Sequence, residues 1–412
     1  MFYKALFDAA NREGHEMRLV VPADSTRVEK VGEFGLIYHL EAPPAPVSPQ
    51  YRMLYPTRFL FPGTQIQRIL NAEAPDLVEV SEKYTMNYLA GLLRTRRLPG
   101  VRVRPTVVGV SHERMDENLA AYFTKHPRGK AFCQWYMKWI YFPMFDHHIT
   151  VSEHTAAELI EASHGHKVKR GIWVAPMGVD ADRFTPAKRT PAARVELESL
   201  VGGNADTTIL LYVGRLAPEK NLPLLMDTAR RLDPGAFRLA IVGEGNMLAE
   251  LREEAQVSNL PHVHFLGHVG DRDKLSRHYA SADAFVHPNP REPFGIAPLE
   301  AMAAGLALVA PNTGGVITYA NDRNAWLSDP DAASFAASVR EIHSMPEIRA
   351  RKTAEARRTA EHYRWDNVTS RHLQLYRELD AITRGTQAAL TMQPRAWTTH
   401  GNAFGRESVA TR

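Results

Sequence analysis

Short apolar runs typical of β-strands alternate with stretches of helical character along most of this sequence, and the alternation occurs in both halves. Such a rhythm indicates parallel sheets with helices on both faces. The runs are 17–22, 35–40, 77–80, 103–110, 147–151 and 172–175 in the first half, and 208–213, 238–242, 262–265, 284–287 and 307–310 in the second. At 412 residues the chain is long enough for two complete cores. The sequence therefore predicts an α/β fold of two doubly wound, Rossmann-like domains that face each other across a cleft.

Changes in composition predict where the domains begin and end. Residues 178–206 contain prolines, charges and the pair Gly202-Gly203 without a sustained period, which is typical of a linker. Residues after Gly385 lose their periodicity, which indicates disorder. The expected segments are a first domain at 1–177, a linker at 178–206, a second domain at 207–363, a last helix at 364–384 and a disordered tail at 385–412.

Composition excludes several classes of protein. The 50 Lys and Arg residues exceed the 46 Asp and Glu residues by only four, and this dispersed excess does not indicate nucleic-acid binding. The one cysteine, Cys133, excludes an internal disulfide and fits a reducing compartment. No run approaches the roughly 18–20 apolar residues of a membrane span, and the N-terminus lacks the apolar core of a secretory signal. We expect a cytoplasmic protein.

Two glutamates, Glu292 and Glu300, flank a turn that opens into a short helix within 291–305. Pro298 suits the first helical turn, where its missing N–H has no cost. We expect free backbone N–H groups at Phe294, Gly295 and Ile296. They lie at the positive end of that helix, so this end is a candidate anion site. Carboxylates do not bind a phosphate, so the glutamates should accept hydrogen bonds from hydroxyls. Sugar hydroxyls on either side of a phosphate describe a nucleotide sugar.

A second phosphate-binding element follows the apolar run 208–213. Gly214 provides a turn, and the cations Arg215 and Lys220 precede the next helix. Arginine can make planar bidentate contacts and lysine acts as a mobile point charge, so the loop suits a diphosphate. The alternatives are an exposed ion pair of these cations with Glu219 or another neighbour, and solvated roles for both glutamates.

Together these two elements resemble those of the retaining, GT-B-fold glycosyltransferases of family 4. The resemblance continues in 175–186, 281–288 and 309–315 and extends to about residue 380. It implies a GT-B fold whose last helix returns to the first domain. It also implies a nucleotide-sugar donor, a glycan, lipid-linked or small-molecule acceptor, and no metal or other cofactor. Peripheral contact with the inner face of a membrane is a further option.

The resemblance also implies roles for single residues. Glu300 should hold the ribose and Glu292 the transferred sugar, while Arg215, Lys220 and the helix N-terminus stabilise the leaving diphosphate. His112, which follows the run 107–110, should reach the donor sugar or its diphosphate; a surface or capping role is the alternative. The catalytic residues are expected to be Arg215, Lys220, Glu292 and His112, and the donor-binding residues Gly214, Arg215, Lys220, Glu292, Phe294, Gly295, Ile296 and Glu300. No nucleophile is evident, which fits the front-face mechanism proposed for this family.

Other motifs carry weaker predictions. Gly243 and Gly245 after a strand fit either a plain strand-to-helix turn or contact with the nucleotide. The pair Asp180 and Asp182 has a metal-binding form, but the family has the same aspartate without a metal role. The aromatic residues Phe132, Trp135, Tyr136 and Trp139, preceded by Lys125, Arg128 and Lys130, recur at helical spacing. That stripe predicts core packing, with a membrane-surface or acceptor-lipid face as the alternative.

The first residues depart from the family pattern. Members open with a hydrophobic strand and a glycine-containing loop, whereas here Met1 already lies in the helix that follows, before Gly14-His15-Glu16. That strand is central in a doubly wound sheet, so its absence should leave two neighbouring strand edges unpaired. We expect a mis-assigned start codon, against a degenerate copy or another element that fills the gap. Two further functions stay open: a truncated, non-catalytic protein that binds nucleotide sugar, and a nucleotide-sugar epimerase on the same fold, which would need acid and base residues in the first domain.

Overall fold

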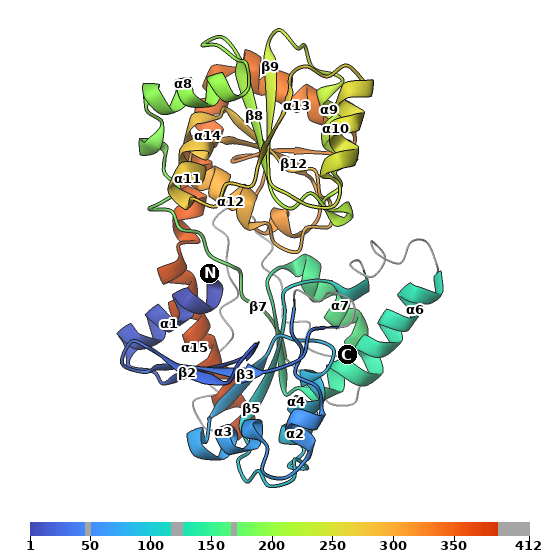
Figure 1. The fold of residues 1–412 in the computed structure, drawn as a ribbon, viewed down its shortest axis with the longest axis vertical. Coiled ribbons are helices and arrows are strands. Elements are labelled where there is room, and N and C mark those ends of the chain that lie inside the picture. Colours follow the sequence, from blue (N-terminus) through green and yellow to red (C-terminus); the bar gives the residue numbers. More distant parts are fainter. Residues whose placement is uncertain (46–50, 117–126, 166–170, 386–412) are drawn as a thin grey trace. The chain divides into compact units, whose positions relative to one another are not determined.

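The computed structural model describes residues 1–45, 51–116, 127–165 and 171–385, which form two compact units (Figure 1). The first unit contains Met1–Asp116, the described residues up to Pro176, and those from Asp366 onward; the second spans Met177–Trp365. The predicted linker at 178–206 is therefore corrected, since it belongs to the second unit and contains η3 (Pro186–Lys188) and α8 (Pro191–Leu200). Thr190 caps α8 by accepting a hydrogen bond from the N–H of Ala193, a local signal for a helix. The predicted tail, apart from Gly385, lies outside the described residues.

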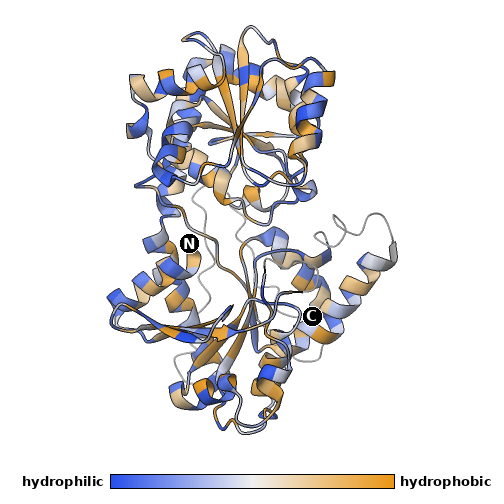
Figure 2. Cartoon of the chain, viewed as in Figure 1, coloured by the Kyte–Doolittle hydropathy of each residue, from blue (hydrophilic) through white to orange (hydrophobic). Residues whose placement is uncertain are grey.

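The second unit is built on one parallel sheet of six strands. They are β8 (Thr208–Val213), β9 (Phe237–Val242), β10 (Val263–Gly267), β11 (Ala284–Val286), β12 (Ala307–Pro311) and β13 (Trp326–Ser328), in the order β10-β9-β8-β11-β12-β13. Five of these match predicted runs, and β13 was not predicted. The strands are mainly hydrophobic, as Figure 2 shows, because helices cover both faces. The order reverses direction at β8, so a topological switch point lies between β8 and β11, where such sheets bind ligands.

Apart from η3 and α8, which precede β8, the described helices of this unit follow the strands in the expected alternation. They are η4 (Pro218–Lys220), α9 (Leu222–Ala229), α10 (Leu248–Val257), α11 (Arg272–Ser281), α12 (Ile296–Ala303), η5 (Gly315–Thr318), α13 (Ala332–Ser344) and α14 (Pro346–His362). Phe335 of α13 and Leu210 of β8 are buried in the same hydrophobic core.

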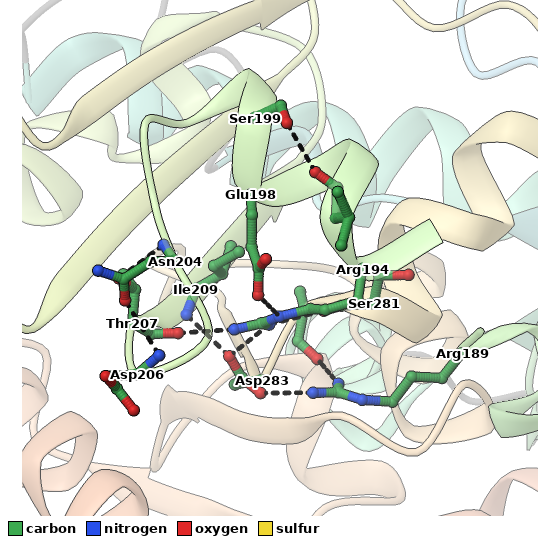
Figure 3. A network of polar contacts seen from close by, with 12 residues as sticks. Arg189, Arg194, Glu198, Ser199, Asn204, Asp206, Thr207, Ile209, Ser281 and Asp283 are labelled. Atoms are coloured by element: carbon green, nitrogen blue, oxygen red, sulfur yellow. Dashed lines mark hydrogen bonds and ion pairs between the residues drawn. The ribbon is translucent and has the colours of Figure 1, made fainter. Parts of the chain in front are cut away.

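A network of ion pairs and hydrogen bonds holds the amino ends of β8 and β11, opposite the carboxyl ends that carry the candidate site (Figure 3). Asp283 accepts hydrogen bonds from Arg194 at 2.8 Å, from Arg189 at 2.9 Å and from the N–H of Ile209 at 2.9 Å. Arg194 also donates to the carbonyl of Thr207 at 2.6 Å. The aspartate within the motif 281–288 is therefore structural, and it ties α8 to the start of β8 and β11.

The first unit contains two separate sheets. One has the order β1-β3-β2, formed by β1 (Met17–Ala23), β2 (Arg27–Val31) and β3 (Gly35–Glu41); the other has the order β4-β5-β6-β7, formed by β4 (Leu77–Val80), β5 (Thr106–Ser111), β6 (His147–Thr150) and β7 (Gly171–Val174). Strand β1 pairs only with β3, and β4 only with β5, so each has one edge unpaired within the described part of the chain. Strands β2 and β7 are the other edge strands of these two sheets.

Helices join these two sheets. The helices of the unit are α1 (Phe2–Glu13), α2 (Thr57–Leu60), α3 (Gln65–Glu73), α4 (Met86–Arg94), α6 (Pro127–Tyr136), η1 (Met137–Tyr141), η2 (Phe142–Met144), α7 (Glu153–Ser163) and α15 (Trp365–Arg384). Arg18 of β1 donates to Glu73 of α3 at 2.5 Å. Tyr3 of α1 donates to Glu79 of β4 at 2.7 Å, and Tyr376 of α15 donates to the same carboxylate.

The aromatic stripe on α6 corrects one prediction. Phe132, Trp135 and Trp139 are half exposed, whereas Cys133 and Met137 between them are buried. The prediction of core packing is therefore wrong for these three residues. Lys125 lies outside the described residues. No helix in the described ranges is both long enough and apolar enough to cross a bilayer.

Candidate active site

The two predicted phosphate elements lie at the carboxyl ends of β8 and β11, the strands on either side of the switch point. Gly214 follows β8 directly, and a Cβ at Gly243 would lie 1.9 Å from its carbonyl oxygen. A Cβ at Gly245 would lie 2.2 Å from the carbonyl oxygen of Leu216. The two glycines after β9 thus let one loop backbone pack on the other, which explains them without a ligand.

Lys220 and Glu292 come from the two different elements and form an ion pair. The Lys220 ammonium lies 2.9 and 3.2 Å from the Glu292 carboxylate oxygens, and both side chains are mostly buried. Asn289 donates a further hydrogen bond to Glu292 at 3.1 Å. Burial acts to raise the pKa of Glu292, but Lys220 and the neighbouring donors outweigh it and hold the pKa below its usual value. Glu292 is therefore an ionised carboxylate at neutral pH.

His287 lies against this pair and was not predicted as a site residue. Its Nε2 is 3.9 Å from Glu292 and has no hydrogen-bond partner among the described residues. Burial lowers the pKa of His287 to about 4, although Glu292 acts in the opposite direction. The imidazole is thus neutral at pH 7. His287 lies in the motif 281–288, directly after β11. That position at the carboxyl end of a strand is the sequence signal that could have predicted it as a site residue.

The N-terminus of α12 adds backbone donors to the same end of the sheet. Gly295 is the N-cap residue, with a φ of 88°, and it has no side chain to accept hydrogen bonds from the first turn. The first N–H groups of a helix have no partner within the helix. Pro298 lies in the first turn, as predicted, and Phe294 is buried so that only its backbone can face a ligand. An anion at this end would meet the N–H groups of Gly295 and Ile296.

Backbone contacts hold the loop between β11 and α12 in place. The N–H of Gly315 donates to the carbonyl of Glu292 at 2.6 Å, and the Tyr319 hydroxyl donates to the carbonyl of Gly295 at 2.5 Å. A Cβ at Gly315 would lie 1.9 Å from the carbonyl oxygen of Pro293. Close backbone approach therefore requires the glycine in the motif 309–315.

Glu300 is buried rather than displayed on a helix surface. Arg272 donates to one of its oxygens at 3.1 Å and the Tyr279 hydroxyl to the other at 3.3 Å. Burial raises the pKa of Glu300 to about 7, against the opposing effect of Arg272. The solvated alternative for Glu300 is thus wrong, and so is the alternative for Glu292. Arg215 differs, since it is exposed and pairs with Glu219 at 3.0 Å, as one alternative predicted.

His112 lies in the first unit, directly after β5. Its ring packs edge-on against Phe2 at 5.9 Å, and burial, with a smaller effect of Lys83, lowers its pKa to about 4. Lys83 is itself buried and donates to Glu158 at 3.3 Å. The sequence analysis did not predict this Lys83–Glu158 pair, because Lys83 lies in the loop after β4 and Glu158 lies in α7, and no local pattern joins them. The structure thus gathers Gly214, Lys220, Glu292 and the α12 N-terminus in one unit, and His112 belongs to the other.

The Asp180 and Asp182 carboxylates face arginines. Asp180 accepts a hydrogen bond from the N–H of Arg183 at 3.1 Å, and Asp182 pairs with Arg364. Within the described residues no group of three or more His, Cys, Asp or Glu side chains could hold a metal ion.

Comparison with known proteins finds matches along most of the chain. The family model described as Glycosyltransferase Family 4 matches residues 3–183, and the model described as Glycosyl transferases group 1 matches residues 201–359. A sucrose-phosphate synthase from Thermosynechococcus elongatus superposes with a TM-score of 0.68 at 20% identity, over 92% of each chain. A protein of Anabaena in complex with UDP and glucose gives 0.64 at 16% identity, over 90% of this chain and 94% of that one.

A relative from Mycobacterium tuberculosis, a GDP-mannose-dependent α-(1-6)-phosphatidylinositol dimannoside mannosyltransferase, is 28% identical over 90% of both chains. The fold and these relatives define the class of protein as a glycosyltransferase of the GT-B fold. The chain belongs to the family 4, or group 1, glycosyltransferases.

Proposed function

We propose that this glycosyltransferase moves a hexose from a nucleoside diphosphate sugar to a hydroxyl of a glycan, lipid-linked or small-molecule acceptor, with retention at the anomeric carbon and without a metal. The observation that carries the proposal is the charged Lys220–Glu292 pair beside the open N-terminus of α12, at the switch point of the sheet. One cation with backbone donors suits a diphosphate, and an adjacent carboxylate suits sugar hydroxyls.

The proposed chemistry follows from where charge develops. When the anomeric C–O bond breaks, its electron pair stays on the diphosphate, and the acceptor oxygen forms the new bond to the anomeric carbon. Lys220, Arg215 and the α12 N–H groups stabilise the leaving diphosphate, the role that a divalent cation has in other transferases. The leaving phosphate takes the acceptor proton in the front-face mechanism. Glu292 holds sugar hydroxyls, and Glu300 holds the ribose.

The names of the relatives suggest which donors to test. The mycobacterial relative is named for GDP-mannose and a phosphatidylinositol dimannoside, and the Anabaena structure holds UDP and glucose. We propose that a guanine or uracil nucleotide carries the hexose here. The predicted cytoplasmic location, with contact at the inner face of a membrane, belongs to the same proposal.

The second candidate function is a non-catalytic protein that binds nucleotide sugar. The open edges of β1 and β4 favour it, because they divide the sheet of the unit that contains His112. Under this proposal the second unit binds the donor, and the first unit performs no transfer.

One experiment separates the candidates. The 412-residue chain is incubated with GDP-mannose or UDP-glucose and a panel of glycan, polyol and glycolipid acceptors, and products are detected by mass spectrometry. An α-linked product by NMR, formed equally in EDTA, supports retention without a metal. A β-linked product, or activity that EDTA abolishes and Mg²⁺ or Mn²⁺ restores, contradicts the mechanism. Donor binding by calorimetry without any transfer supports the second candidate.

A further inference from the structure

The outer face of α6 and η1 displays three large aromatic side chains. Phe132, Trp135 and Trp139 have exposed fractions of 56%, 50% and 54%, and their spacing places them on one side of the helix. Phe132 and Trp135 stack at 6.0 Å. Tryptophan is a costly residue to expose in water, and a continuous group of such rings marks an interaction site.

Contacts on the opposite side keep this face turned outward. Cys133 and Met137 are buried at 1% exposure, and Tyr136 accepts a hydrogen bond from Asn87 and donates one to the carbonyl of Lys83. Gln134 on the other flank donates to Glu161 of α7 at 3.0 Å. Packing on the opposite side of the helix therefore holds Phe132, Trp135 and Trp139 on the surface of the protein.

The charge of this segment indicates the partner. The stretch 127–144 contains Arg128, Lys130 and Lys138 and no Asp or Glu, in a chain whose total formal charge is only +4. The Lys138 ammonium lies 5.4 Å from the ring centre of Trp139. Aromatic rings with lysines beside them suit the headgroup region of a bilayer, where rings enter the boundary and cations meet anionic lipids. A second copy would instead bring cations against cations.

We propose that Phe132, Trp135, Lys138 and Trp139, with Lys130 at the start of the helix, dock the protein on an anionic bilayer. This docking assigns a surface to the membrane contact that is part of the proposed function, but it does not depend on the transfer itself, since lipid binding is measured without donor or acceptor. If transfer fails but binding holds, the docking surface stands.

The test uses the full chain and sedimentation with liposomes of phosphatidylcholine alone or mixed with phosphatidylglycerol. The triple variant Phe132→Ser, Trp135→Ser, Trp139→Ser should lower the partition coefficient on the anionic liposomes by at least about tenfold, because it removes the rings that enter the boundary. The matched control replaces three exposed apolar residues elsewhere, Val28→Ser, Phe61→Ser and Val257→Ser. It should bind within about twofold of the unchanged chain.

A second variant tests the charges. Lys130→Glu with Lys138→Glu should lower binding to anionic liposomes at least about tenfold, since each cation near the surface attracts anionic lipids and each glutamate repels them. Circular dichroism and a melt verify that each variant is folded. The proposal is overturned if the unchanged chain does not bind anionic liposomes, if the triple variant binds like the control, or if neutral liposomes bind equally. Light scattering that shows a dimer lost only in the triple variant would assign the face to a second copy.

Discussion

Arg215 and Lys220 belong to the same short loop after β8, yet their surroundings differ. Arg215 is two-thirds exposed and pairs with Glu219, whereas Lys220 is mostly buried against Glu292. An exposed ion pair adds about 0–1 kcal/mol to stability, but a buried carboxylate that loses its cation is strongly destabilising. The two cations therefore allow function and folding to be separated within one loop.

Arg215→Ala should leave the melting temperature nearly unchanged and lower turnover about a hundredfold, because one donor to the leaving diphosphate is lost. Lys220→Ala should lower turnover similarly and also lower the melting temperature, because Glu292 keeps its burial without its ammonium partner. Thermal melts and kinetics with saturating donor measure both effects. Equal melting temperatures for the two variants would show that the Lys220–Glu292 pair has no structural role.

The pKa of Glu300 predicts a pH dependence of donor binding. Since burial raises that pKa to about 7, the carboxyl is partly protonated at neutral pH. Ribose hydroxyls donate to the ionised form, so affinity should rise as pH increases from 6 to 8 and then level off. Calorimetry with the intact nucleotide sugar measures this, because its diphosphate does not titrate in that range. In Glu300→Gln the rise should disappear. A rise that persists in this variant would place the titration elsewhere.

Sequence patterns predicted candidate site residues but not the side chains that contact them. Lys220 and Glu292 were both predicted at the donor site, yet their ion pair depends on β8 lying beside β11, which is a property of strand order. The burial of Glu300 likewise depends on Arg272 and Tyr279 from α11. The side-chain contacts between loops are set by tertiary packing, and a single sequence does not encode them locally.

At the scale of elements, the longer buried strands were predictable, whereas the short buried strand β13 and the exposed strand β2 were not. Apolar runs identified β8 and β9 because helices cover both sheet faces. Strand β2 is polar and mostly exposed, so its sequence does not resemble a buried strand. The stripe on α6 was misinterpreted for a related reason: helical spacing shows that residues share a face, but not whether that face meets the core.

Gly315, at the start of η5, gives a first prediction at the scale of elements. Gly315→Ala places a Cβ where the Pro293 carbonyl lies, so the loop that carries Glu292 must shift. We expect a loss of about 1–3 kcal/mol in the free energy of unfolding, as for other overpacked sites, together with weaker donor binding. Gly270→Ala, where the nearest atom is 3.6 Å away, is the matched control. Normal affinity in a destabilised Gly315→Ala would show that Glu292 does not depend on this contact.

The unpaired edges of β1 and β4 give a second prediction at the scale of elements. The variant carries a strand of about five residues and a glycine-containing turn, fused before Met1. With α1 as the crossover helix, this strand and β1 would form a β-α-β unit, so the added strand should pair in parallel with the free edge of β1. Amide hydrogen exchange in β1 and β4 should slow, and the melting temperature should rise. The control fusion carries proline at alternate positions, which removes the donors. Equal protection from both fusions would mean that the edges do not accept a strand.

At the scale of the whole molecule, the sequence predicted two α/β domains but misplaced the boundary between them. Residues 178–206 lack a strong period, yet they complete the second unit. The N–H of Val179 donates to the carbonyl of Tyr363 at 2.8 Å, and Gly178 packs against Trp365. These contacts join the two ends of the unit across almost two hundred positions, and no composition change marks them.

A fragment that spans Met177–Trp365 should therefore fold alone and bind nucleotide sugar, whereas a fragment that begins at the predicted boundary, Thr207, should not be stable. The shorter fragment loses Arg189 and Arg194, so Asp283 would keep only the backbone N–H of Ile209 as a partner. Removing one side of a buried ion pair typically costs about 3–5 kcal/mol. Asp283→Asn in the shorter fragment should recover part of that loss, because the amide needs no counter-charge. Melts and donor titrations of the three fragments test this. A Thr207 fragment as stable as the longer one would show that residues 177–206 are a linker after all.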